Sequence, residues 1–190
     1  MAWIDQWLPQ WQFEDVHNIR SRAAPGALLD AAAAYDPAHD AVIQAALALR
    51  AAPARLAGKL GRPAAGAQRA QFGLNDFVPL GRQGDMAMAY GLAGRFWQAD
   101  YGLQPLADAA AFQAYAETDA AKLVLGFSTG QADGVTTLTT LTRVHCGSAA
   151  ARRRLAAYWL LARPVSGLLR RRVLADVRRA AEAGPGSTAA

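Results

Sequence analysis

The sequence predicts an α+β fold in which a strongly curved antiparallel sheet wraps around a long C-terminal helix, with two helices after the first strand. Three observations predict it: helical segments follow an extended start, alternating segments typical of strands fill the middle, and residues 148–183 form one long amphipathic pattern. An antiparallel sheet with one buried face needs a helix across that face, and the last helix is long enough to supply the cover.

The composition is that of one folded domain. Of the 190 residues, 53% are hydrophobic and 18% charged, so we expect a single domain over residues 1–183 and a flexible tail over 184–190. The start does not resemble a signal peptide, and no apolar run approaches the roughly 20 residues of a transmembrane helix. One cysteine, Cys146, excludes an internal disulfide and a cysteine-cluster metal site. We therefore expect a cytoplasmic protein without a transmembrane segment.

The net charge of +5 is concentrated near the end of the chain, where nine arginines lie between Arg152 and Arg179. Such a cluster can attract nucleic acid or an anionic membrane. More often it is the solvated face of a helix, and here the arginines surround the predicted helix on three sides. No nucleic-acid partner is expected.

The first part of the chain predicts a turn, a strand and two helices. Residues 1–12 hold three tryptophans around Pro9 and are expected to dock as a short turn. The expected strand covers residues 13–23. Helices are predicted over 27–35 and 40–50, the second from apolar residues at 3.6-residue spacing. Residues 58–71 contain four glycine or proline residues and predict a surface loop.

The middle of the chain predicts most of the sheet. The expected strands cover residues 72–80, 85–97, 122–129 and 135–146, and a short helix is expected over 107–117. Gly91 and Gly94 inside the second of these strands predict strong curvature or a β-bulge. A turn at Gly130–Gly134 joins the last two strands as a hairpin.

The predicted C-terminal helix carries an apolar stripe along one side. The stripe consists of Leu155, Tyr158, Trp159, Ala162, Val165, Leu169, Val173, Val177 and Ala180. Pro164 should bend this helix in the middle, because its ring removes one backbone hydrogen bond and clashes with the carbonyl of residue 160.

This order of elements is that of the helix-grip fold, and several motifs carry a matching resemblance. They are Leu8-Pro9 ahead of a strand containing His17, the string from Tyr90 to Trp97, the string from Leu138 to Val144, and the helix pattern from Tyr158 through Arg163-Pro164 to Arg170. Together they resemble an uncharacterised bacterial branch of the START, polyketide cyclase and pollen allergen superfamily (SRPBCC). The resemblance spans roughly residues 5–183 and implies a cavity between sheet and helix.

The chain departs from that family at two positions. Relatives often carry one glutamate where this chain has Leu141 and another near Ala87, so an acidic pair is missing from the sheet and carboxylate-based chemistry is in doubt. The resemblance assigns no catalytic residue.

Other kinds of site find little support in the sequence. His17, His39 and His145 are scattered, whereas a closed zinc site needs three or four converging ligands, so no metal and no cofactor are expected. Cys146 and His145 are neighbours on a strand and therefore point to opposite faces, which favours an inert thiol. No phosphate-binding glycine loop precedes a helix.

The aromatic residues predict where a ligand would bind. We expect a pocket between the last helix and the strand that bears Tyr90 and Leu92; its other walls would be Phe127, Tyr158 and Trp159. Arg163 and Arg170 border the helix stripe, where a guanidinium could pair with a carboxylate. His17 is placed near the mouth of the pocket. Each feature also has a purely structural interpretation. The aromatic residues would then form a packed core, the two arginines would form salt bridges, and His17 would be a hydrogen-bonded wall residue.

Three functions are compatible with these features. The favoured one is a binding protein for a small hydrophobic, lipid or polyketide-like molecule, which carries an anionic end in one version. The second is a cyclase- or aromatase-like enzyme that uses the same cavity, with His17 as the one candidate acid–base residue. The third is a binder of anionic surfaces or nucleic acid through the basic helix. Ligand identity and oligomeric state stay open.

Overall fold

The computed structural model describes residues 2–36, 40, 76–98 and 101–184. Within these residues the chain is an α+β protein. Its strands are β1 (Phe13–Ser21), β2 (Val78–Gln83), β3 (Ala87–Gly94), β4 (Ala121–Ala132) and β5 (Val135–Cys146). Its helices are α1 (Ala2–Asp5), α2 (Pro25–Ala33), α4 (Ala109–Ala114) and α5 (Ala149–Ala183).

The five described strands form one antiparallel sheet in the order β1-β5-β4-β3-β2. The first strand pairs with the last, so that Phe13 lies opposite Val144. The other strands form a meander in which each strand pairs with the next along the chain. Asp133 and Gly134 join β4 to β5 with positive φ angles of 51° and 72°, as a two-residue hairpin turn requires. The predicted hairpin is therefore confirmed, with a tighter turn than the sequence suggested.

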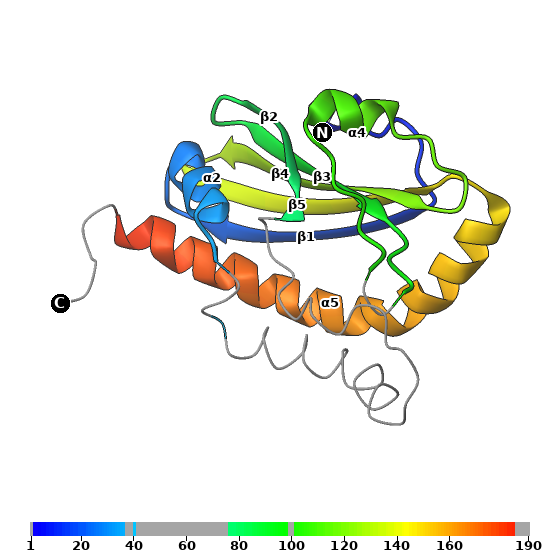
Figure 1. Cartoon of the computed structure of the whole chain (residues 1–190). Coiled ribbons are helices and arrows are strands. Elements are labelled where there is room, and N and C mark those ends of the chain that lie inside the picture. The colour runs from blue at the N-terminus through cyan, green and yellow to red at the C-terminus, as the bar shows by residue number, and fades with distance from the viewer. Residues whose placement is uncertain (1, 37–39, 41–75, 99–100, 185–190) are drawn as a thin grey trace.

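Helices lie against both faces of this sheet (Figure 1). α5 runs along one face together with α2, and α1 and α4 lie on the opposite face. Because successive residues of a strand point to opposite sides, one strand supplies side chains to the helix layers on both faces of the sheet. On β5, Leu138 packs with α2 and α5, whereas Leu141 packs with α1. The predicted antiparallel sheet with the C-terminal helix across one face is confirmed.

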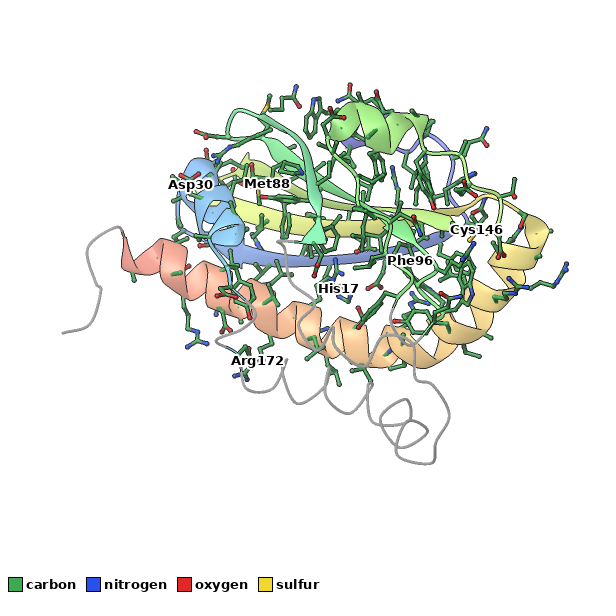
Figure 2. The ribbon with its side chains drawn as sticks, viewed as in Figure 1. His17, Asp30, Met88, Phe96, Cys146 and Arg172 are labelled. Atoms are coloured by element: carbon green, nitrogen blue, oxygen red, sulfur yellow. The ribbon has the colours of Figure 1, made fainter. Side chains whose placement is uncertain are left out.

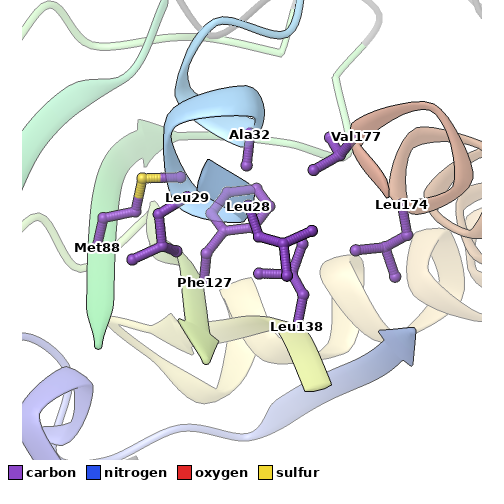
Figure 3. Close-up of a cluster of buried hydrophobic side chains, with 8 residues drawn as sticks. All are labelled: Leu28, Leu29, Ala32, Met88, Phe127, Leu138, Leu174 and Val177. Carbon is purple, nitrogen blue, oxygen red and sulfur yellow. The ribbon is translucent and has the colours of Figure 1, made fainter. Parts of the chain in front are cut away.

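The close-up in Figure 3 shows how α2 joins sheet and helix into one core. Leu28 and Leu29 of α2 meet Phe127 and Leu138 of the sheet and Leu174 of α5. Full burial of each such side chain contributes roughly 1.5–3 kcal/mol. α2 begins two residues earlier than predicted, at Pro25. Proline is favoured in the first turn of a helix, because a backbone N–H there would have no partner within the helix.

α5 begins where Ser148 accepts a hydrogen bond from the backbone N–H of Ala151. Figure 1 shows the predicted bend: the yellow N-terminal turns rise at an angle to the orange and red remainder, and Pro164 lies inside the helix. The predicted stripe is wrong at Val165, which is 50% exposed, and at Ala180, which is also exposed, and it omits the buried Leu174. A stripe drawn for a straight helix fails because the two halves on either side of the bend present different faces to the sheet. No helix among the described residues is both long and apolar enough to cross a bilayer.

Several predicted boundaries need correction. The strand predicted over 85–97 ends at Gly94, and the helix predicted over 107–117 shortens to α4. The strand predicted over 72–80 corresponds to β2, which starts at Val78, and residues 72–75 lie outside the described residues. The predicted helix over 40–50, apart from Asp40, and the predicted loop over 58–71 also lie outside them, as do residues 185–190 of the predicted tail.

The glycines of β3 allow neighbouring atoms to come close to the strand and do not form a β-bulge. β3 pairs with β4 in unbroken register from Ala87 to Gly94. A Cβ on Gly94 would lie 2.9 Å from the carbonyl oxygen of Tyr101, so the absence of a side chain admits a neighbouring backbone. The register shift falls on β2, between Pro79 and Gly81. Proline cannot donate to the ladder and is tolerated there because β2 is an edge strand.

Candidate functional site

Polar side chains gather on the sheet beneath the middle of α5. Asp15 and His17 are two residues apart on β1, so both point to the face that α5 covers. Directly opposite them on β5 stand Thr142 and Thr140. Side chains opposite one another on adjacent strands lie about 4.5–5.5 Å apart at Cβ. We call these four residues, together with Arg163 and Arg170 of α5, the polar centre.

Asp15 and His17 form a close pair within the polar centre. Nε2 of His17 lies 2.8 Å from Oδ2 of Asp15, and the two side chains are only 14% and 10% exposed. Figure 2 shows His17 on the side of β1 that faces α5. Gly167 covers it: a Cβ there would lie 3.5 Å from Cε1 of His17. A Cβ at position 167 would therefore be in ordinary van der Waals contact with the imidazole ring.

Arg163 and Arg170 approach the polar centre from α5 in different ways. Nε of Arg163 lies 3.7 Å from Oδ1 of Asp15, and the Arg163 side chain is largely exposed. Exposed pairs of this kind contribute at most about 1 kcal/mol. Arg170 is enclosed between helix and sheet and donates a hydrogen bond of 3.2 Å from Nη1 to Oγ1 of Thr140. Burial lowers the pKa of Arg170, and the charge of Asp15 partly opposes that shift.

The polar centre leaves hydrogen-bonding capacity unused. A guanidinium has five N–H donors, and Thr140 is the one hydrogen-bond partner of the Arg170 guanidinium in the described part of the chain. No described carboxylate lies within ion-pair distance of it. The buried Oγ1 of Thr142 also has no hydrogen-bond partner among the described residues. Buried polar groups usually have partners, so this combination is unusual for a packed helix–sheet interface.

Apolar clusters flank the polar centre on both sides along α5. At one end Tyr90 and Phe127 meet edge to face, with ring centroids 6.5 Å apart, in the cluster that includes α2. At the other end Trp159 packs against Phe13 at 5.5 Å, beside Leu92 and Tyr158.

The structure thus brings His17, Arg163 and Arg170 together but divides the predicted aromatic wall. Tyr90 and Phe127 belong to one cluster, and Tyr158 and Trp159 to another. Two hollows among the described residues lie elsewhere. One, of about 790 Å³, opens near Ser21 and Glu182, and the other, of about 300 Å³, lies beside α4.

Sequence reasoning missed Asp15, Thr140 and Thr142 as members of the site. The alternation that places Asp15 on the same strand face as His17 was available, but the sequence does not say that this face lies under α5. The threonines alternate along β5 in the same manner. The pairing of β1 with β5 brings Asp15 and His17 next to the two threonines. The sequence does not reveal this pairing, because it joins residues more than 120 positions apart.

Four of the nine arginines of α5 have an acidic partner among the described residues. Arg154, Arg163, Arg172 and Arg179 each have an aspartate within 4.0 Å. Among the described residues, no three His, Cys, Asp or Glu side chains come together in a way that could hold a metal ion.

No family model, no curated protein and no solved structure matches this chain. What the chain does must accordingly be argued from its own residues and geometry.

Proposed function

We propose that the chain is a helix-grip domain, similar to the SRPBCC superfamily, that binds a small apolar molecule with an anionic group between α5 and the sheet. The strand order supports the fold proposal, because the first strand closes the sheet beside the last one and the long C-terminal helix crosses the same face. The motif from Leu138 to Val144 lies on β5, and the motif from Tyr90 to Trp97 lies on β3 and directly after it, so β4 separates the two in the sheet.

The observation that carries the ligand proposal is the buried guanidinium of Arg170. Asp15 acts on this cation only from beyond ion-pair distance, and a carboxylate or phosphate in contact would stabilise it through charge-assisted, two-point hydrogen bonds. Thr142 offers a further hydroxyl nearby, on the strand position opposite Asp15. The two apolar clusters beside the polar centre would then receive the remainder of the ligand.

Access for such a ligand requires the middle of α5 to move away from the sheet. Pro164 lacks one helical hydrogen bond, and Gly167 faces His17 without a side chain to pack against it. Both residues lie in the part of the helix that covers the polar centre. The helix is therefore weakest where the ligand would enter.

The test compares dodecanoate with dodecanol, which has the same chain without the charge, by isothermal titration calorimetry. We expect dodecanoate to bind at least tenfold more tightly than dodecanol. Arg170→Met should remove that preference, because methionine keeps the packing volume but not the charge. Arg171→Met, at the exposed neighbouring arginine, is the matched control and should keep the preference. Equal binding of both ligands by the parent protein would contradict the proposal, as would an unchanged preference in Arg170→Met.

A second candidate function is a cyclase-like enzyme at the same place, favoured by one observation. The carboxylate of Asp15 lies 2.8 Å from Nε2 of His17 and is positioned to orient the ring, as a general acid–base residue needs. If the domain is an enzyme, Asp15→Asn and His17→Gln should stop turnover of a polyketide-like substrate while dodecanoate still binds. Native mass spectrometry of the protein as expressed would identify a co-purified ligand or substrate in either case.

A further inference from the structure

A second site is suggested by the hollow of about 300 Å³ beside α4, on the sheet face opposite the polar centre. Its wall is formed by Gln113, Tyr115, Ala116, Glu117, Ala120, Ala121, Lys122, His145 and Gly147. Lys122 and His145 are paired residues on β4 and β5, so their side chains stand next to one another on the same face. The hollow therefore has an amine and an imidazole in its floor.

Lys122 is held by the end of α4. Its Nζ lies 3.4 Å from the carbonyl oxygen of Phe112, 3.2 Å from that of Gln113, and 5.3 Å from the centre of the Phe112 ring. No described carboxylate lies within ion-pair distance of it. Two carbonyls use two N–H donors, so a neutral amine held in this way keeps its lone pair for another partner.

His145 is held in one tautomer by its neighbour Gln12. The amide oxygen of Gln12 accepts a hydrogen bond of 2.7 Å from the backbone N–H of Cys146, which fixes the orientation of that amide. Its nitrogen must then donate to Nδ1 of His145, 3.3 Å away. A neutral His145 therefore carries its proton on Nε2, as a hydrogen-bond donor.

The opposite wall of the hollow is equally constrained. A Cβ on Gly147 would lie 2.3 Å from the carbonyl oxygen of Glu117, so only glycine permits this backbone contact. The N–H of Gly147 also donates to the carbonyl of Ala120 at 3.0 Å. The loop that carries Tyr115 and Glu117 is thereby fixed against the strand, and the hollow has a defined shape.

We propose that Lys122 is a reactive amine that binds small aldehydes or ketones in this hollow as an imine. The lone pair of neutral Nζ attacks the carbonyl carbon, and proton transfer from nitrogen to oxygen gives a carbinolamine. Loss of its hydroxyl group with a proton, as water, leaves the C=N bond, and the Nε2–H of His145 is placed to assist that departure. Hydrolysis reverses the reaction, so no oxidant or reductant is needed. This site is independent of the function proposed for the polar centre.

Burial lowers the pKa of Lys122, which enlarges the neutral fraction at any pH below that pKa. The titratable groups facing the hollow are Tyr115, Glu117 and His145. The pKa of Tyr115 is raised, chiefly by burial and then by the charge of Glu117, so this phenol stays neutral near pH 7. No described carboxylate contacts Lys122, so its ammonium form is stabilised by two carbonyl dipoles and the Phe112 ring and not by an ion pair.

The experiment traps the imine with propionaldehyde and cyanoborohydride and maps the label by peptide mass spectrometry. The chain has two lysines, Lys59 and Lys122, so each label is assigned without ambiguity. The ratio of labelling at Lys122 to that at Lys59 is measured at pH 7 in the native protein and again in guanidinium chloride. We expect the native ratio to exceed the unfolded one at least fivefold. A native ratio equal to or below the unfolded one would overturn the proposal.

Two variants sharpen the result. Lys122→Arg retains a cation for the carbonyls of α4 but cannot form an imine, so label near position 122 should vanish. His145→Phe should slow labelling at Lys122 without changing labelling at Lys59. An unchanged rate at Lys122 in His145→Phe would contradict the assisting role, and a half-maximal labelling pH as high as in the unfolded chain would contradict a reactive amine.

Discussion

Two neighbouring residues at the end of β5 show how a strand divides chemistry between its faces. Cys146 lies in the cluster under α5, whereas His145 lines the hollow beside α4. Burial raises the pKa of the Cys146 thiol to about 11, against which the charge of Arg152 acts weakly. The expectation of a buried, inert thiol agrees with this placement.

Alkylation of Cys146 by iodoacetamide at pH 8 should be about a hundredfold slower in the native protein than in guanidinium chloride. The thiolate is the reacting species, and a raised pKa lowers its fraction at pH 8. Because Cys146 is the single cysteine of the chain, mass spectrometry of the intact protein measures the rate directly. Comparable rates in the native and unfolded protein would show that the thiol is not buried and that its pKa is not raised.

The contact between α4 and β3 depends on the absence of a side chain at Gly91. A Cβ at position 91 would lie 2.6 Å from Cδ2 of Phe112 and 2.9 Å from Cδ2 of Leu80. Both of these side chains are buried, so neither can move away without disturbing its own neighbours.

Gly91→Ala should therefore lower the free energy of unfolding by about 1–3 kcal/mol, the usual cost of overpacking. Gly130→Ala on the neighbouring strand is the control, because nothing lies within 4 Å of its added Cβ and its φ is ordinary. Chemical denaturation followed by tryptophan fluorescence gives both values. A Gly91→Ala protein as stable as Gly130→Ala would mean that α4 is not pressed against β3 as described.

At the scale of the whole molecule, one arginine ties the N-terminal segment to the sheet. Arg143 on β5 is 7% exposed and donates from Nε to Glu14 at 2.7 Å and from Nη1 to Asp5. Its guanidinium also stacks 3.5 Å from the centre of the Trp11 ring. These contacts hold α1 and the following residues over the sheet face that α5 does not cover.

Arg143→Met should destabilise the fold by about 1–3 kcal/mol, because two carboxylates lose their charged partner. Solvent screens the partly exposed Asp5 and Glu14, so the cost stays below that of a fully buried pair. Hydrogen exchange should rise in residues 2–12 and stay unchanged in α5. Arg153→Met, at an exposed arginine of α5, is the control. An equal increase in hydrogen exchange in residues 2–12 and in α5 would contradict a local role of Arg143.

Local pattern predicted more of the elements than of the site. Strand β5 was predicted at its observed bounds, since threonine and β-branched residues alternate there with leucine and valine. The bend at Pro164 was predicted because its cause is local to the helix. The site residues His17, Arg163 and Arg170 were named without their partners, and the aromatic wall was drawn as one surface although it forms two.

By itself, the sequence determined the periodicities: which segments alternate, which repeat every 3.6 residues, and where proline and glycine interrupt them. Only the tertiary structure decided that β1 pairs with β5, which sets Asp15 and His17 across from Thr142 and Thr140 beneath Arg170. It likewise decided that Lys122 and His145 share a hollow. The physical reason is that periodicity fixes the face on which a residue lies, whereas the residue opposite it depends on strand pairing across long chain separations.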